Sequence, residues 1–438
     1  MFPASRSHDK LIGSKEPWLQ WRFGREAFPA YSLRISKGDG TVSTLFIGVD
    51  VSKDSSSAQG LDREGKKLFY LEFSMDGEGF SRFLGRVKAH CRDLSEVTVA
   101  MESTGCYHIN LFSFLSSEGI ACVVINPLLI RNFARLSLRK TKTDKKDALT
   151  IAQFLLAHKD SLSQVAFSQN RQDLKDLARE RESLTVLISG LKNDLRRLLQ
   201  MTFPELEHRC KLFTETMLRF LIKFPSARAI QMAKPKEIAK ALIHVEGKRK
   251  RVLISAEEII RLAKSSVASD SAAKELILSE KISTLLYLEE KKKKITGVLV
   301  KSCQSMRVKD LEIITSIDGI KQINGSAFLA ELGEINHFKS HKHVIAFAGL
   351  DPSVHQSGQF EGMSKISKRG NRHLRRVIFL MTSCVVRSNN VFRQYFLKRK
   401  EEGLPPKKAI LATAHKLLRV LFAMLTTKSY FRKEVLEV

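Results

Sequence analysis

The chain has 438 residues, of which 43% are hydrophobic and 27% are charged, a composition that is typical of soluble globular proteins and excludes a mainly disordered chain. Its 74 Lys and Arg residues outnumber its 46 Asp and Glu residues, which gives a net charge of +28. Such a surplus attracts polyanions, so the expected partner is nucleic acid or an anionic membrane surface. We expect no transmembrane helix and no secretory leader, because no 18 consecutive residues are all apolar. The six cysteines form no CxxC pair, which favours buried thiols in a reducing cytoplasm.

The first half of the chain predicts an α/β domain over residues 43–160. Residues 1–42 show no sustained hydrophobic period and are expected to be a flexible extension, with a lone amphipathic helix as the alternative. Three strands in succession, followed by alternating helices and strands, is the order expected of a ribonuclease-H-like domain. The expected strands are 45–51, 57–61, 67–73, 97–101 and 120–125, and the expected helices are 80–91, a helix from 107, and 144–158.

The segment 161–305 is predicted to be helical with a coiled-coil seam. Its apolar residues alternate in steps of three and four over several heptads. Periodic helices resume at 254–262 and 276–300. The two halves can fold back as an antiparallel coiled coil or pair between subunits, and both alternatives stay open. The basic cluster 248–251 between them is a solvated face or a phosphate contact. The seam residues are Leu174, Leu177, Leu184, Ile188, Leu191, Leu195 and Leu198.

The segment 306–438 is predicted to be a helical domain with two glycine-punctuated stretches. Gly319 and Gly325 suit a tight turn between two short helices, which either offers backbone N–H groups to a phosphate or forms a plain hairpin in a core. The second stretch, 349–376, leads into an apolar helix from Val377 and a final helix at 409–426.

Four acidic residues stand out as candidate metal ligands. Asp50 lies in an otherwise apolar strand, and Glu102 follows another strand, where α/β sites form. Asp144 and Asp147 face one side of a helix start, although an N-cap and helix-dipole role is the simpler reading of that pair alone. Together the four can supply the hard oxygen ligands that two-metal phosphodiester chemistry requires, with Mg²⁺ as the expected ion.

Two basic segments are expected to contact nucleic acid. The first leads into Asp144, and the second, 364–376, contains six Lys or Arg residues and no acid. One or two of these cations can stabilise charge at a reacting phosphorus, and the others position the backbone. His355 and His373 could shuttle protons but are more often structural. The residues expected to bind nucleic acid are Arg139, Lys140, Lys142, Lys368, Arg369, Arg372 and Arg375.

The motifs FIGVDVSK, AMESTGCY, INP and KTDKKDA, in this order, resemble those of the four-carboxylate transposases of the insertion-sequence 110 class. That family also includes the Piv/MooV-type DNA invertases, and the resemblance covers roughly residues 44–430. It implies a RuvC-like, ribonuclease-H-like N-terminal domain and a helical C-terminal transposase domain. The family's acidic tetrad would correspond to Asp50, Glu102, Asp144 and Asp147.

The resemblance also implies a serine nucleophile in the C-terminal domain. GLDPSVHQSG followed by ISKRGNRHLRR places Ser357 in that role, with Ser353 as the fallback.

The family further implies donor and target DNA as substrates and a structured non-coding bridge RNA as guide. We expect a cytoplasmic prokaryotic homo-oligomer, a dimer or tetramer joined through the coiled coil. The alternatives are a Piv-like invertase, a junction-resolving nuclease that needs no serine, and a non-catalytic nucleic-acid-binding protein. The long interval between Asp147 and Ser357 departs from the simplest family layout.

Overall fold

The computed structural model divides the chain into two compact units, Met1–Ala166 and Phe167–Val438, which are described separately. The extension 1–42, the cations Arg139, Lys140 and Lys142, and His355 lie outside the described residues. The described residues are 44–103, 105–134, 143–160, 162, 167–246, 249–252, 254–353, 356–357, 360–361 and 365–432.

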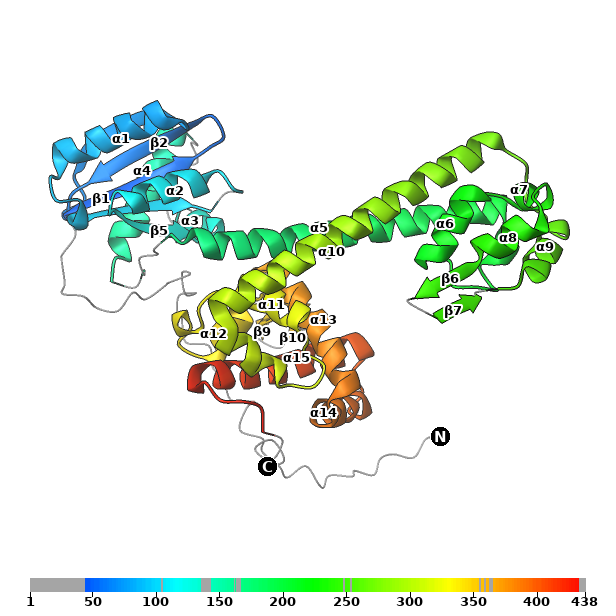
Figure 1. Cartoon of the computed structure of the whole chain (residues 1–438). Coiled ribbons are helices and arrows are strands. Elements are labelled where there is room, and N and C mark those ends of the chain that lie inside the picture. The colour runs from blue at the N-terminus through cyan, green and yellow to red at the C-terminus, as the bar shows by residue number, and fades with distance from the viewer. Residues whose placement is uncertain are drawn as a thin grey trace, which may run out of the picture. The chain divides into compact units, whose positions relative to one another are not determined.

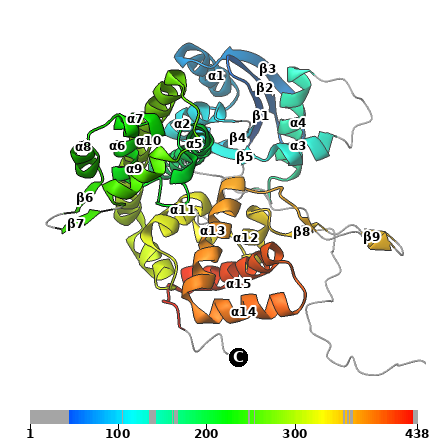
Figure 2. The ribbon, with the colours of Figure 1, turned by 90° about the vertical axis from the view of Figure 1, so that its right-hand side faces the viewer.

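The first unit contains a five-stranded mixed sheet in the order β3-β2-β1-β4-β5. Figure 1 shows the unit, and Figure 2 labels each strand of the sheet. β2 pairs antiparallel with both β3 and β1, whereas β4 pairs parallel with both β1 and β5. The prediction of an α/β domain followed by a mostly helical remainder is confirmed, and the helix α3 is an addition to it. The strands are β1 Leu45–Val51, β2 Ser55–Leu61, β3 Lys67–Ser74, β4 Val97–Glu102 and β5 Ala121–Ile125, and the helices are α1 Gly77–His90, α2 His108–Ser117, α3 Pro127–Ala134 and α4 Asp144–Ala157.

Helices cover both faces of this sheet (Figure 2). Phe46 of the central strand β1 packs with Ile151 and Phe154 of α4 on one face. On the other face Phe73 of β3 stacks on Phe83 of α1, with ring centroids 4.8 Å apart. Because both faces are covered, the central strand is a continuous apolar run, and a carboxylate at its end stands out in the sequence.

Two long helices, α5 (Gln169–Thr202) and α10 (Ala272–Thr315), run side by side in the second unit (Figure 1). The ion pairs Lys192–Glu289 at 2.6 Å and Lys281–Asp194 at 2.7 Å fix an antiparallel arrangement. Of the two alternatives for the seam, the structure therefore places the pairing within one chain. The seam residues Leu174, Leu184, Ile188, Leu195 and Leu198 are buried, and Leu177 and Leu191 are partly buried.

The connection between these two helices folds into a small module of its own, defined here as residues 203–271. Its core contains Phe203, Phe220 and Ile259, which pack against the adjoining ends of α5 and α10. Of its helices only α9 matches a predicted segment, and part of the basic cluster lies in the strand β7. The elements are α6 Glu215–Lys223, α7 Ala227–Gln231, α8 Pro235–Ala241, β6 Ile243–Glu246, β7 Arg249–Val252 and α9 Ala256–Lys264, together with the short turn of helix Pro204–Leu206.

The far ends of α5 and α10 join the C-terminal helices in a second core, which includes Leu174, Leu299, Ile314, Ile378 and Leu418. Two short strand pairs, β8–β11 and β9–β10, are also present. The helix expected from Val377 begins at Arg372, and α14 was not predicted. The elements are α11 Gln322–Leu332, α12 His341–Phe347, β8 Pro352–Ser353, β9 Gln356–Ser357, β10 Phe360–Glu361, β11 Lys365–Ile366, α13 Arg372–Ser388, α14 Asn390–Glu401 and α15 Pro406–Thr427.

The turn between α10 and α11 is packed into this core. Gly319 has a φ of +100°, and a Cβ there would lie 2.7 Å from the Cα of Val385. Its neighbours Ile317 and Ile320 are buried. These contacts favour the reading of a plain hairpin in a core. The second glycine, Gly325, lies within α11 rather than in the turn.

One described helix, α15, is long and apolar enough to span a membrane by length and composition. Its residues Leu417, Leu418, Leu421 and Leu425 are buried in the C-terminal core. Packing in that core accounts for the hydropathy of the helix.

Candidate active site

Asp50 and Glu102 lie side by side at the carboxyl ends of β1 and β4. These strands are parallel, and Val49 pairs with Met101, so the next residue on each strand continues the same row. Both carboxylate side chains are half-buried. Loops and helices that follow parallel strands gather at this kind of edge, which is where α/β proteins build their sites.

Both side chains point to the face of the sheet that α4 covers. A Cβ on Gly48 would lie 2.2 Å from the backbone nitrogen of Ala152 in α4. Asp50 is two residues further along β1 and therefore shares this face. On β4, Ala100 pairs with Gly48 and packs in the same cluster as α4, so Glu102 faces the same side.

The first turn of α4 lies toward the same edge. The amine of Lys159, beyond the end of α4, is 5.9 Å from the ring of Phe46 near the start of β1, so α4 runs opposite to β1. Asp144 and Asp147 are in the first turn, and the hydroxyl of Thr143 accepts the backbone N–H of Lys146 as the N-cap. The alternative in which Asp144 caps this helix is therefore wrong.

Three further polar residues lie near Asp50 on the same face of the sheet, and the sequence analysis did not predict them. Ser57 pairs with Asp50, and Glu72 pairs with Ser57. The Tyr70 hydroxyl donates to Glu72 and lies 3.2 Å from the Ser57 hydroxyl. Burial, the hydrogen bond to Glu72 and the nearby Asp144 carboxylate raise the pKa of Tyr70, so it is a neutral donor. The strand register places Ser57 and Glu72 in the row of Asp50, whereas Tyr70 pairs with Gln59 and lies on the same face in the adjacent row.

The donors at this edge match a hard divalent cation in chemistry. Carboxylate oxygens are the protein ligands that Mg²⁺ takes. Within the described part of the chain, no three His, Cys, Asp or Glu side chains already form one cluster around a common point. The structure thus brings Asp50 and Glu102 together through the strand register, whereas Asp144 and Asp147 lie toward the same edge without completing a cluster with them.

The basic segment of the C-terminal domain is held in a fixed loop. A Cβ on Gly370 would lie 2.1 Å from the carbonyl oxygen of Phe347. The Ser367 hydroxyl donates to the Asp351 carboxylate at 2.5 Å, and the backbone N–H of Lys368 donates to the Gly349 carbonyl. These contacts leave the side chains of Lys368, Arg369 and Arg372 exposed.

A buried carboxylate anchors the end of this loop. Glu331 of α11 accepts from the guanidinium of Arg179 on α5 at 2.8 Å and from the side-chain amide of Asn371 at 2.7 Å. Asn371 in turn caps α13 by accepting from the N–H groups of residues 373 and 374. His373 lies 2.7 Å from Glu182, which supports the structural reading of this histidine. The network fixes where the basic segment meets α13.

Arg375 and Ser357 are the remaining expected site residues of the C-terminal domain that the structure describes. Arg375 is half-buried and donates to the carbonyl of Ala348 at 2.8 Å, a contact that supports the fold. Ser357 lies in β9, with its backbone paired to Phe360 of β10. The two units are separate bodies, so Ser357 and the carboxylates are each placed only within their own unit.

Family comparison covers both parts of the candidate site. Residues 47–204 match a model described as a transposase, and residues 311–397 match the model of the transposase IS116/IS110/IS902 family. The chain belongs to this transposase family. The first match contains all four carboxylates, and the second contains Ser357 and the basic segment. As a member, the chain is a DNA transposase or recombinase. The 203–271 module lies almost entirely between the two matched regions.

Similar proteins cover nearly the whole transposase. The insertion element IS116 uncharacterized 44.8 kDa protein of Streptomyces clavuligerus is 25% identical over 88% of this chain and 96% of its own length. The pilin gene-inverting protein of Moraxella bovis is 24% identical over 90% of this chain and 100% of its own. The transposase for insertion sequence element IS1111A of Coxiella burnetii is 23% identical over 88% and 91%.

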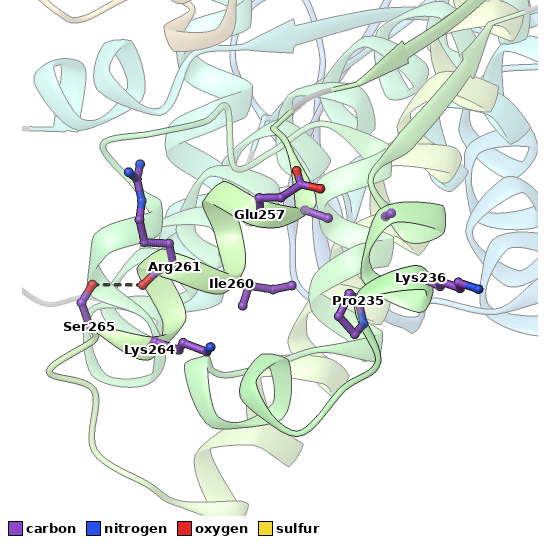
Figure 3. Close-up of a pocket in the computed structure, with 9 residues that line it drawn as sticks. Pro235, Lys236, Glu257, Ile260, Arg261, Lys264 and Ser265 are labelled. Atoms are coloured by element: carbon purple, nitrogen blue, oxygen red, sulfur yellow. Dashed lines mark hydrogen bonds between the residues drawn. The ribbon is translucent and has the colours of Figure 1, made fainter.

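A surface cavity of about 800 Å³ lies in the 203–271 module of the transposase (Figure 3). Pro235 and Ile260 line its apolar part, and Lys236, Glu257 and Arg261 lie around them on α8 and α9. None of the residues expected to act in catalysis lines this cavity.

Replacing Gly48 with Ala is expected to destabilise the first unit by about 3 kcal/mol, the upper end of the usual cost of overpacking, and to reduce DNA cleavage. The new methyl group would meet the backbone of Ala148 and Ala152 and would force α4 away from the sheet. Thermal unfolding and a cleavage assay measure the two effects. Gly85→Ala in α1 is the matched control, because its methyl group meets nothing within 4 Å and a helical Ala is slightly favoured. Equal melting temperatures for Gly48→Ala and the parent would contradict the close packing.

Proposed function

We propose that this transposase cuts and rejoins DNA for a mobile element, using Mg²⁺ at a ribonuclease-H-like, RuvC-like edge and Ser357 as the nucleophile. The observation that carries the proposal is the shared edge of the sheet. Asp50 and Glu102 point to the face covered by α4, and the first turn of α4 brings Asp144 and Asp147 toward the same edge. The mixed sheet order supports the fold assignment.

Asp50, Glu102, Asp144 and Asp147 would hold the ion. Bound Mg²⁺ would neutralise phosphate charge and orient the attacking and leaving oxygens. The serine hydroxyl would lose its proton and form an oxygen–phosphorus bond, while a bridging phosphorus–oxygen bond of the DNA breaks and its sugar oxygen takes up a proton. Attack by a DNA hydroxyl on the serine phosphodiester would reverse these changes and restore the serine.

Insertion and inversion are both open outcomes for such chemistry. The similarity to a pilin gene-inverting protein over 90% of this chain favours inversion as a second candidate function. The two differ in the arrangement of the recombining sites and not in the strand chemistry. A junction-resolving nuclease would share the carboxylates but would use water in place of Ser357.

The expected partners are donor DNA, target DNA and a structured guide RNA. The net charge of +28 supports polyanion binding in general. A guide that pairs with DNA would read the sequence, and the protein would then need mainly backbone contacts. We also propose a cytoplasmic homo-oligomer, a dimer or tetramer. Because the seam pairs within one chain, a contact between copies would use the outer surface of the α5–α10 pair, where Val186, Leu187 and Tyr287 are exposed.

Binding of RNA or DNA is expected to weaken steeply with salt, with a log–log slope of about −0.7 to −0.9 for each phosphate neutralised. Replacing Lys368, Arg369 and Arg372 with Gln should make the slope less negative by about 2 to 3, which corresponds to one phosphate for each cation. All three side chains are exposed, the first two on the fixed loop and Arg372 at the start of α13. Fluorescence anisotropy across a series of salt concentrations measures this slope. Replacing the exposed Lys234, Lys236 and Lys240 of the 203–271 module makes the same change in charge. Equal slopes for both triple variants would show that net charge alone acts.

The proposed function is tested with the parent chain, its co-purified RNA and a DNA substrate whose cleaved end cannot religate. We expect cleavage with Mg²⁺, none with excess EDTA, and a protein–DNA adduct that survives denaturation. Cleavage without an adduct would favour the junction-resolving nuclease. Binding without cleavage in Mg²⁺ or Mn²⁺ would favour a non-catalytic protein.

A further inference from the structure

The acidic first turn of α4 extends beyond the point where the helix is pressed onto the sheet. The closest backbone contact of α4 with β1 lies at Gly48, beneath Ala148 and Ala152. Asp144 precedes that contact by one helical turn, and Thr143, Asp144 and Lys145 are all exposed. Any group that holds this turn against the sheet therefore also determines where its carboxylates lie.

Lys145 makes a direct contact from this turn to the sheet. Its Nζ lies 4.9 Å from the centre of the Tyr70 ring on β3. The Tyr70 hydroxyl donates to Glu72 and lies 3.2 Å from the Ser57 hydroxyl. Ser57 is the register partner of Asp50. One chain of contacts thus runs from Lys145, which follows Asp144 directly, through Tyr70 to Ser57 in the row of Asp50.

We infer that Tyr70 is a positioning residue for the carboxylate edge: its ring holds Lys145, and thereby the first turn of α4, over Asp50. The inference rests on the proposed function, in which Asp50, Glu102, Asp144 and Asp147 share a divalent cation. A cation–π contact at an exposed site changes an equilibrium by a few-fold. Without this contact the first turn of α4 can move. Bringing Asp144 and Asp147 to the ion then lowers the affinity for the metal.

The experiment measures Mn²⁺ binding to the full chain without DNA, by the electron paramagnetic resonance signal of free Mn²⁺. Tyr70→Leu and Lys145→Met are each expected to raise the dissociation constant about threefold. The double variant should show the effect of one change and not their product, because each removes the same contact. Tyr70→Phe keeps the ring and Lys145→Arg keeps a cation, so both should stay near the parent.

A matched contact in the other unit serves as control. The amine of Lys291 lies 5.1 Å from the ring centre of Tyr287 on α10, and Tyr287→Leu should leave Mn²⁺ affinity unchanged. Lys145→Met changes an exposed side chain and carries the test even if Tyr70→Leu fails to fold.

The outcomes separate this inference from the proposed function. If Asp50→Asn loses Mn²⁺ affinity while Lys145→Met and a folded Tyr70→Leu bind as the parent does, the metal site stands and the positioning role is overturned. If Asp50→Asn binds Mn²⁺ like the parent, both proposals are overturned. Reduced DNA affinity in Lys145→Met with parental Mn²⁺ affinity would instead make Lys145 a phosphate contact and overturn the inference.

Discussion

Asp50→Asn is expected to lower DNA strand cleavage about a thousandfold or more while the fold and nucleic-acid binding survive. Asp50 lies near the carboxyl end of the central strand, on the face covered by α4 and beside Glu102, and its loss removes a proposed metal ligand. Loss of several kcal/mol of transition-state stabilisation corresponds to this factor. A gel-based cleavage assay at saturating Mg²⁺ measures it, with anisotropy for binding and thermal melting for folding.

Asp54→Asn is the matched control, since this exposed acid follows Asp50 by four residues in the turn after β1. We expect it to cleave DNA within about twofold of the parent rate, because removing an exposed charge has a small effect. Parental cleavage by Asp50→Asn would remove this carboxylate from the catalytic set. Equal loss in both variants would point to the charge of the whole edge and not to a ligand.

The second large effect is expected for Ser357→Ala, which should eliminate any covalent protein–DNA adduct. Alanine has no hydroxyl to attack phosphorus, whereas the proposed metal site lies in the other unit and should keep its affinity. Ser357→Cys should retain at most a trace of adduct, because a thiolate is nucleophilic but matches a hard cation poorly. A denaturing gel with a suicide DNA substrate and Mg²⁺ measures the adduct.

Ser353→Ala, in the neighbouring strand β8, is the paired control and should form adduct at the parental level. If Ser357→Ala still forms adduct and Ser353→Ala does not, the nucleophile is Ser353. If Ser357→Ala releases cut DNA without an adduct, water is the attacking group, and the protein acts as a nuclease.

The sequence predicted the strands of the first unit well, because local composition determined them. Leu45–Val51 is apolar except for Gly48 and Asp50, and helices on both faces require such a strand. The cluster of Ser57, Tyr70 and Glu72 on the face of Asp50 could not be predicted in the same way. Register is a non-local property, and a shift of one residue would have turned these side chains to the opposite face.

Two other features escaped prediction for different reasons. The 203–271 module consists of short helices, such as α7 and α8, whose few turns give no clear hydrophobic period. The anchor of the basic segment joins Glu331 to Arg179, residues far apart in the chain. The proposed role of Ser357 came from family resemblance alone, since an isolated Ser-Gly step is ordinarily a turn.

The antiparallel course of α5 and α10 changes how the long interval between Asp147 and Ser357 should be understood. Leu174 near the start of the outward helix and Leu299 on the returning helix belong to one core. The chain segment between these two residues is therefore long, but both of its ends are anchored in the same core. Lengthening or shortening the outer tip would add or remove chain without shifting either anchor. That tip, for example at the exposed Val267, is where we expect this enzyme to tolerate a fused reporter domain, and where its relatives should differ most in size.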